Sequence, residues 1–458
     1  MKKQRELKTM GRSLGLGFGW LLAFVVPLAA QQRDTSQMPP GVALATRYTI
    51  RNRPALAVQP FAAASMLVNT ASDVTRVIEN DLRISDRFEV RPTPQSLANG
   101  SVDYPQWNSL NIVWVVAGEL TATTSGFRLD VTLHDVVFGK AQQRRSFTLP
   151  TASSPDFRMA IHAASDEVVR WIFNQPGMAA SRIAFVRQNG NGKYDLLLVD
   201  SDGENVRRIA GSDAQIYSPT WSPDGSKLAY VVSQEQGWQL IERDLETGRT
   251  RVLQTDQNLL VTPHYSPDGS KIAFANWLQG GLEIQELDIG AASVRRLTSS
   301  AGDNMSPSYA PDGRRITFHS TRTGRQHIYV MAAEGGNATV LSPFGDGVEY
   351  AAPDWSASGT EVVFHGRSRG GVYQIMLANA SRSGGQVEQL TREGENEDPS
   401  WAPDGRHVVY SSGVRGRTPG LYVIDTVTGN IRSLVTGAKL RIADWSPSLA
   451  ARFGAASH

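Results

Sequence analysis

The 458-residue sequence is long enough for two or three domains and contains no cysteine, which excludes disulfides, thiolate metal sites and cysteine nucleophiles. Residues 1–30 hold five of the 46 Lys and Arg and one of the 44 acidic residues. The remainder, with 41 basic and 43 acidic residues, is close to neutral, so nothing in the composition suggests nucleic-acid binding.

The first 30 residues have the pattern of a signal peptide. A basic start runs from Lys2 to Arg12, an apolar stretch follows from Leu14 to Val26, and Ala29-Ala30 precedes Gln31. The apolar stretch falls short of the roughly 20 residues that a membrane-spanning helix needs. We therefore expect cleavage, export to the periplasm and no transmembrane segment in the mature chain. Residues 31–46 are polar and are expected to form a flexible N-terminal segment.

Residues 47–176 alternate between strand and helix patterns. Apolar residues on one face predict a helix over 72–84, and a second helix is expected to open at Ser154-Pro155. Strands are predicted by alternating or continuous apolar runs at 55–58, 88–90, 112–117, 127–134 and 145–149. This pattern predicts an α/β N-terminal domain.

From residue 177 to about 450 the chain is a repeat. An aromatic residue precedes a Ser/Ala-Pro-Asp-Gly-like turn in six segments, and successive aromatics lie 44, 44, 46, 46 and 44 residues apart. A period in the low forties indicates a propeller or a helical array. β-rich runs between the turns, and Pro-Asp-Gly punctuation in nearly every repeat, favour strands. The aromatics are Trp221, Tyr265, Tyr309, Trp355, Trp401 and Trp445, which we interpret as spacers packed between neighbouring sheets.

The repeat count predicts a closed ring. Sets of three strands run at about 182–209, 227–253, 271–297, 315–341, 361–390 and 407–434, and the first set lacks an inner strand. The segment 440–446 is an inner strand with no set after it. Pairing the two ends gives an all-β six-bladed propeller of four-stranded antiparallel blades, followed by a tail at 451–458.

Few residues suggest catalysis. Gly366 to Gly370 matches a serine-hydrolase elbow, but strands are expected on both sides, where the elbow requires a helix after it. No H-E-x-x-H motif is present, and His264, His319, His327 and His365 are interpreted as packing or surface residues. Four acids at one mouth of the ring could ligate a channel cation such as Ca²⁺, although a polar rim for protein contact is the preferred interpretation: Asp303, Glu349, Glu397 and Asp398.

With these features the mature chain resembles the TolB family of periplasmic proteins of the Tol–Pal system. Besides the leader and the blades, the N-terminal domain carries motifs similar to those of that family. They are Ala57-Val-Gln-Pro60-Phe61, Asp81-Leu82-Arg83, Trp107, Val116-Ala-Gly118 and Ala164-Ser165-Asp166-Glu167. The resemblance covers about residues 47–450.

The resemblance implies a non-catalytic, monomeric scaffold without a cofactor. Such a protein binds the peptidoglycan-associated lipoprotein Pal at one propeller mouth and supports outer-membrane integrity and constriction during cell division. The resemblance implies partner contacts just before the inner-strand prolines, and the loops that crowd the same mouth of the ring add Tyr217. These positions are Tyr217, Leu259, Leu260, Thr262, Asp303, Asn304, Met305, Glu349, Tyr350, Asn396, Glu397 and Asp398.

The resemblance further implies a contact between TolA and the mature N-terminal segment. In the family a strand begins almost at the mature end, whereas here the matching Tyr48-Thr-Ile50 follows about 16 additional residues. This departure from the family's pattern counts against carrying the TolA contact over to this chain. Two other functions are left open by the residues alone: a propeller related to prolyl-oligopeptidase-like hydrolases, and a sugar- or cation-binding propeller.

Overall fold

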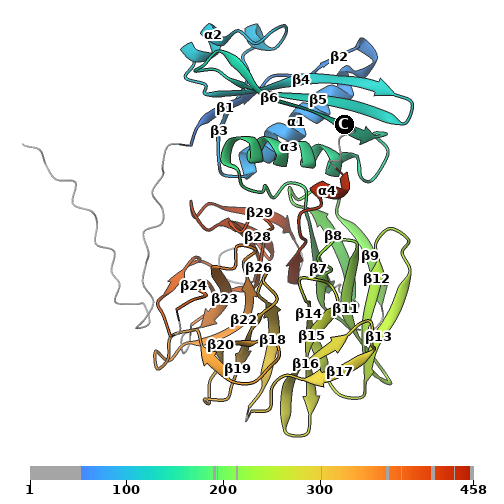
Figure 1. The fold of residues 1–458 in the computed structure, drawn as a ribbon, viewed down its shortest axis with the longest axis vertical. Helices are drawn as coiled ribbons and strands as arrows, with labels where there is room; N and C mark the ends of the chain where they lie inside the picture. The colour runs from blue at the N-terminus through green and yellow to red at the C-terminus, as the bar shows by residue number, and fades with distance from the viewer. Residues whose placement is uncertain are drawn as a thin grey trace, which may run out of the picture. The chain divides into compact units, whose positions relative to one another are not determined.

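A computed structural model of the protein describes residues 53–453, apart from positions 189–191, 193, 213–214, 301, 368–370, 383, 414–417 and 438. The predicted signal peptide, the N-terminal segment and Tyr48-Thr-Ile50 lie outside the described residues. The described chain forms one six-stranded sheet with helices, followed by six four-stranded sheets (Figure 1). An α/β domain and a six-bladed propeller are therefore confirmed.

The sheet of the α/β domain is mixed. β1 lies parallel to both of its neighbours, β3 and β4, while β4, β5 and β6 form an antiparallel meander. The short β2 extends the sheet beside the second half of β4. The strands are β1 (Ala55–Val58), β2 (Ala62–Ala63), β3 (Glu89–Arg91), β4 (Trp114–Thr123), β5 (Gly126–Asp135) and β6 (Lys140–Pro150).

Two long helices pack on this sheet. Val74, Ile78 and Leu82 of α1 and Ile161, Ala164 and Val168 of α3 are buried in one core with the sheet. The second helix begins later than predicted, because the Ser154 carbonyl accepts a hydrogen bond from Phe157 N and closes a turn before it (3.1 Å). The helices are η1 (Ser65–Leu67), α1 (Val68–Ile84), η2 (Gln95–Leu97), α2 (Tyr104–Ser109), α3 (Phe157–Phe173) and α4 (Ala450–Phe453). Within the described residues, no helix combines the length and apolar character required to cross a bilayer.

Gly118 on β4 lies where the sheet leaves no room for a side chain. A Cβ atom there would lie 1.8 Å from the Asp130 carbonyl oxygen and 2.8 Å from the ring of Phe61. Because backbone would have to move, we expect Gly118→Ala to lower the free energy of unfolding by about 1–3 kcal/mol. Urea denaturation would measure the loss. Gly290→Ala is the control, since its Cβ would approach no atom closer than 3.6 Å. Equal stability of the two variants would contradict the argument.

The propeller blades are built from strands that follow one another in the chain, with one exception at the closure. Each strand pairs antiparallel with the next from the channel outward. In blade order the strands are β30 (Leu440–Trp445), β7 (Arg182–Gln188), β8 (Tyr194–Asp200), β9 (Arg207–Ser212); β10 (Gln215–Trp221), β11 (Lys227–Gln234), β12 (Gly237–Asp244), β13 (Thr250–Asp256); β14 (Leu260–Tyr265), β15 (Lys271–Leu278), β16 (Gly281–Asp288), β17 (Ser293–Arg296); β18 (Asn304–Tyr309), β19 (Arg315–Ser320), β20 (His327–Ala332), β21 (Ala338–Val340); β22 (Glu349–Trp355), β23 (Glu361–Arg367), β24 (Gln374–Asn379), β25 (Val387–Gln389); β26 (Asn396–Trp401), β27 (His407–Ser412), β28 (Gly420–Asp425) and β29 (Ile431–Thr436).

The ring closes as predicted. The C-terminal β30 pairs with β7, with Leu440 opposite Arg187 and Trp445 opposite Ile183. Beyond the strand, the Arg182 backbone N–H donates to Ser446 Oγ (2.9 Å). The closing blade therefore takes its inner strand from the opposite end of the propeller sequence.

The repeated motif shapes a hairpin and an inter-blade contact. In the first motif the Gly225 N–H donates to the Ser222 carbonyl (2.8 Å), and Asp224 Oδ1 accepts from Ser226 N (3.0 Å). Gly225 has a φ of 65°, which a side chain would strain. All six motif aromatics are only 5% exposed, which confirms that they are packed spacers. The Trp221 indole also donates to the Asp444 carbonyl of the preceding blade (3.1 Å).

Candidate functional site

The inner strands share a backbone feature that the repeat pattern did not reveal. In every blade, one residue within the inner strand takes a positive φ, and the six values lie between 44° and 52°. Register shifts mark a β-bulge at the same place in all six inner strands. The six residues line a channel cavity of about 200 Å³: Ser218, Thr262, Ser306, Ala352, Asp398 and Ile442.

Polar side chains also link neighbouring blades around the channel. The Trp355 backbone N–H donates to Ser308 Oγ of the preceding blade (3.1 Å), and Trp401 N donates to Asp354 Oδ2 (2.8 Å). At the closure, Trp221 N donates to Asp444 Oδ2 (2.8 Å). These channel-facing groups satisfy backbone N–H groups that the bulges leave without strand partners.

Burial governs the protonation of the channel carboxylates. It raises the pKa of Asp444 to about 8, with the neighbouring Asp354 adding to the effect, while the Trp221 N–H opposes it. Burial likewise raises the pKa of Asp398 to about 6, with Glu397 as the second cause. Since a protonated carboxyl makes a poor cation ligand, a cation at Asp444 would have to displace a proton at neutral pH.

Of the histidines singled out in the sequence, His319, His327 and His365 are packed in the interior, and His264 lines the channel cavity. Burial lowers the pKa of His319 to about 4, and burial together with His319 and Arg367 lowers that of His365 to about 3. Each neutral ring accepts a backbone N–H of the next blade, His365 Nδ1 from Asp398 N (3.0 Å). Burial also lowers the pKa of His264 and of His327. In the elbow-like segment, β23 ends at Arg367 and β24 begins at Gln374, whereas Ser368 lies outside the described residues.

The predicted partner residues divide into two groups by burial. Eight are partly exposed around the starts of the inner strands: Tyr217, Leu259, Thr262, Asp303, Met305, Glu349, Glu397 and Asp398. The other four are buried: Leu260 and Tyr350, which belong to apolar cores, and Asn304 and Asn396. The buried four position the rim and are not available for direct contact in this structure.

The two buried asparagines organise loops at the rim in the same way. Asn304 Nδ2 donates to Glu283 Oε2 (3.1 Å) and to the Gly302 carbonyl (3.2 Å). In another blade, Asn396 Nδ2 donates to Gln374 Oε1 (3.0 Å) and to the Glu393 carbonyl (2.8 Å). A shared position and shared bonding indicate a structural role, since a buried amide without these partners would destabilise the fold.

The partly exposed residues form an apolar side and an acidic side. Leu259 and Met305 pack with Trp238 against one small core, and Tyr217 stacks at a tilt on Trp238 with ring centroids 5.4 Å apart. Glu397 and Asp398 provide the acidic side, and burial followed by repulsion from Glu395 raises the pKa of Glu397. Sequence analysis missed Trp238 because it lies on β12, outside the repeated motif.

The four acids proposed as channel-cation ligands do not converge. Asp303 Oδ1 accepts from Leu282 N (2.9 Å), and Glu349 pairs with Arg367 (3.1 Å). In the described part of the chain, groups of three possible metal ligands occur at Asp81–His162–Asp202 and at Asp86–His407–Asp425, and neither group includes these acids.

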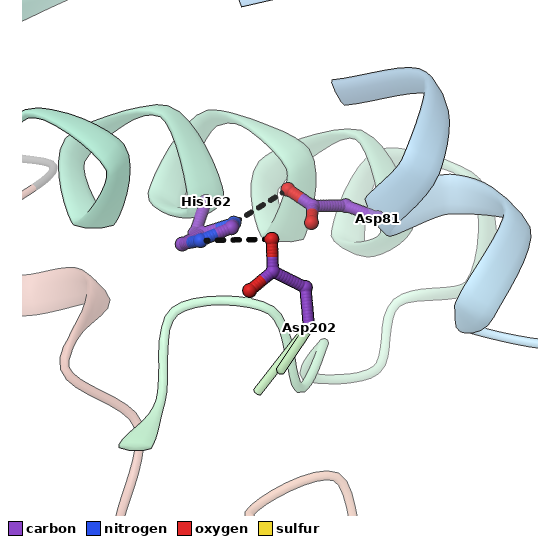
Figure 2. Close-up of side chains that lie close together, drawn as sticks. All are labelled: Asp81, His162 and Asp202. Atoms are coloured by element: carbon purple, nitrogen blue, oxygen red, sulfur yellow. Dashed lines mark hydrogen bonds and ion pairs between the residues drawn. The ribbon is translucent and has the colours of Figure 1, made fainter. Parts of the chain in front are cut away.

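The first of these groups lies where α1 and α3 meet the propeller loop after β8. Figure 2 shows His162 between two carboxylates, with one dashed line from each ring nitrogen. His162 Nδ1 donates to Asp81 Oδ2 (2.8 Å), and Nε2 lies 3.8 Å from Asp202 Oδ2. Burial alone would lower the pKa of His162, but the carboxylates of Asp81, Asp202 and Asp200 raise it to about 9. The ring is therefore an imidazolium at neutral pH, which makes this group an ion-pair cluster.

Comparison with protein families gives two consecutive matches. Residues 47–142 match the TolB amino-terminal domain, and residues 170–449 match the TolB beta propeller domain. The two matches follow each other along the chain in the same order as the α/β domain and the propeller.

Two curated relatives and one solved structure that are similar to this chain are TolB proteins. The chain is 33% identical over 206 residues to the Tol-Pal system protein TolB of Actinobacillus pleuropneumoniae serotype 5b, and 32% identical over 207 residues to that of Methylococcus capsulatus. Each alignment covers 43% of this chain and 46% of the relative, so the chain spans about half the length of the curated relatives it matches. The crystal structure of TolB from Acinetobacter baumannii aligns with a TM-score of 0.76 and 27% identity, over 87% of this chain and 97% of that one.

Proposed function

Because the chain belongs to the TolB family of the Tol–Pal system, we propose that it is a non-catalytic scaffold of the bacterial envelope. It works in the periplasm as a monomer, after removal of residues 1–30. Its organisation is an α/β domain at 47–176 and a propeller at 177–450. The family matches and the fold support this proposal.

The partner in the proposal is a Pal-type peptidoglycan-associated lipoprotein, held at the propeller mouth where the inner strands begin. The observation that carries the proposal is the two-sided rim, with Leu259, Met305 and Trp238 on the apolar side and Glu397 and Asp398 on the acidic side. Apolar anchors bordered by charged groups are typical of the centre and edge of protein interfaces. Through this contact the protein would support outer-membrane integrity and constriction during division.

The rim suits a partner segment with an apolar residue and a basic or hydrogen-bond-donating residue. Asp398 carries a pKa of about 6, raised by burial and by Glu397. In the free protein, burial and the charge of Glu397 make the ionised form of Asp398 unfavourable. A positively charged group of the partner would stabilise that ionised form, and this stabilisation would contribute to binding. The proposed TolA contact is separate and involves the N-terminal segment, which lies outside the described residues.

Calorimetric titration with the soluble domain of a Pal-type lipoprotein tests the mouth. We expect Met305→Ala, and a double variant with Glu397→Ala and Asp398→Ala, each to weaken binding by about 1–3 kcal/mol, because each removes contacts at one side of the rim. Tyr350→Ala is unsuitable for this purpose, since Tyr350 is buried and donates its hydroxyl hydrogen to Asp346 (2.5 Å).

Val252→Ala is the matched control, an exposed apolar residue on the outer strand β13. It should leave the affinity unchanged. Wild-type affinity in both rim variants, with unchanged melting temperatures, would exclude this mouth as the partner site. No detectable binding by the wild-type protein would instead argue against the choice of partner.

A further inference from the structure

His407 on β27 is a buried histidine with one ring nitrogen unaccounted for. The residue is 1% exposed, and its Nδ1 donates to Asp404 Oδ2 (2.7 Å). The bond to Asp404 orients the ring and leaves Nε2 without a hydrogen-bond partner.

Two carboxylates flank that free nitrogen. Asp86 Oδ2 and Asp425 Oδ2 each lie 4.0 Å from His407 Nε2. Asp86 follows the C-terminal end of α1, whereas Asp425 ends β28 of the propeller. A separation of 4.0 Å is too long for a hydrogen bond, so neither oxygen serves as an acceptor for this nitrogen.

Both carboxylates are held in place by other bonds. Asp86 adopts a φ of 54°, which costs a non-glycine residue conformational energy, and its Oδ1 accepts from Asn430 Nδ2 (2.6 Å) and Arg53 Nη1 (3.2 Å). Asp425 Oδ1 accepts from Val427 N (2.7 Å), and Arg406 Nη2 contacts Oδ2 (2.5 Å). Asp86 Oδ2 is thus left facing the imidazole.

We propose that Asp86, His407 and Asp425 form a divalent-metal site of the zinc class, with Asp404 as the carboxylate that orients the histidine. With a zinc–nitrogen bond of about 2.0–2.1 Å and a zinc–oxygen bond of about 2.0–2.2 Å, a tetrahedral ion would require each 4.0 Å gap to close by about 0.6 Å. A carboxylate on the far nitrogen of a metal-binding histidine is the usual support for such a ligand.

The cluster in Figure 2 differs in the features that matter for a metal. There His162 Nδ1 is hydrogen-bonded to Asp81, one of the three possible ligands. His162 Nε2 therefore faces only Asp202, which is also paired with Arg158. Around His407, by contrast, the orienting carboxylate is a fourth residue, so two other carboxylates face Nε2. Asp425 Oδ2 is paired with Arg406, and this contact would have to loosen when an ion binds. The free nitrogen with two facing carboxylates assigns the metal to the His407 site.

The site would join the two folded parts of the chain. One ligand comes from the α/β domain and two come from the propeller, where Arg406 Nη2 also donates to the Asp86 carbonyl (3.1 Å). Nearby Arg406 and Arg53 offset part of the carboxylate charge, which lowers the affinity below that of a site without cations. Asp86 is 15% exposed, which gives the ion a route to the site.

Titration of the mature protein, free of any affinity tag, with Zn²⁺ tests the proposal by calorimetry. We expect one site in the wild type, at least tenfold weaker binding in His407→Gln and in Asp86→Asn, and about 10–100-fold weaker binding in Asp404→Asn. His134→Gln removes a half-buried histidine elsewhere in the α/β domain and should bind as the wild type does.

Asp86→Asn guards against a folding artefact, because a partly exposed carboxylate is replaced by an amide of the same shape. Its circular dichroism spectrum should match that of the wild type. Co²⁺ as a second probe should give the visible absorption of a low-symmetry, four-coordinate ion in the wild type and lose it in His407→Gln. Absence of a one-to-one Zn²⁺ site in the wild type, or its persistence in both His407→Gln and Asp86→Asn, would overturn the assignment.

Discussion

Deletion of residues 439–458 should lower the melting temperature by more than about 10 °C or prevent folding. The deletion removes β30, which is the inner strand of the closing blade. It takes away the buried side chains of Leu440 and Trp445 and leaves β7 with an open edge toward the channel. Burial of each large apolar side chain contributes about 1.5–3 kcal/mol, and the stability of a whole domain is about 5–15 kcal/mol.

Deletion of residues 454–458 alone is the control for the truncation. It leaves β30 and Leu449, which packs on Met159 and Ala163 of α3, in place. Differential scanning calorimetry of the two truncations and the full mature chain makes the comparison. A melting temperature within one or two degrees of the full chain after deletion of 439–458 would show that the strand pairing across the ring ends contributes little.

The propeller could be predicted because its information is local and repeated. Trp221 and its five counterparts recur at nearly constant spacing, and each precedes a turn whose residues have few alternative conformations. The unpaired segment 440–446 predicted closure because an inner strand without a blade needs a partner. The α/β domain followed from apolar periodicity, although the start of α3 was placed too early.

The functional geometry was harder to predict because it depends on contacts between distant residues. Asp81 and His162 meet across 81 positions of sequence, and Asp86 lies beside His407. Neither pair has a motif spacing that would mark it. At the rim, Tyr350 and Met305 were equally good candidates in the sequence because both lie at the start of an inner strand. In the structure Tyr350 is buried, whereas Met305 is partly exposed. The positive φ values of the inner strands arise from bulges, which are not marked by one residue type at that position.

Asp81→Asn should be among the most destabilising single substitutions in the α/β domain at pH 6. His162 carries a positive charge there, since its pKa is raised to about 9, and neither side chain is exposed. Removal of one partner from a buried ion pair leaves an uncompensated charge and typically costs about 3–5 kcal/mol. Ser165 Oγ, which also donates to Asp81 (2.7 Å), would lose a charged acceptor as well.

The pH dependence of this loss follows from the sign of the histidine shift. Unfolded His162 has an ordinary pKa of 6.5, and the folded value is higher. The extra stability is therefore complete below about pH 6.5 and is lost as the pH rises through about 9. Asp166, whose pKa burial raises to about 7, also makes the fold less stable as the pH rises, and Asp81 and His162 are smaller causes of its shift. The wild-type-minus-variant difference therefore removes most of the Asp166 contribution and reports chiefly on His162.

Urea denaturation of both proteins at pH 6 and pH 9.5 measures that difference. We expect a loss of about 3–5 kcal/mol at pH 6 and a much smaller loss at pH 9.5, where the imidazole no longer needs a counter-charge. Asp73→Asn on the same helix is the control, because its pair with Arg76 is exposed and should contribute less than about 1 kcal/mol at either pH. An equal loss at both pH values would mean that Asp81 stabilises the fold by hydrogen bonding alone, with His162 neutral throughout.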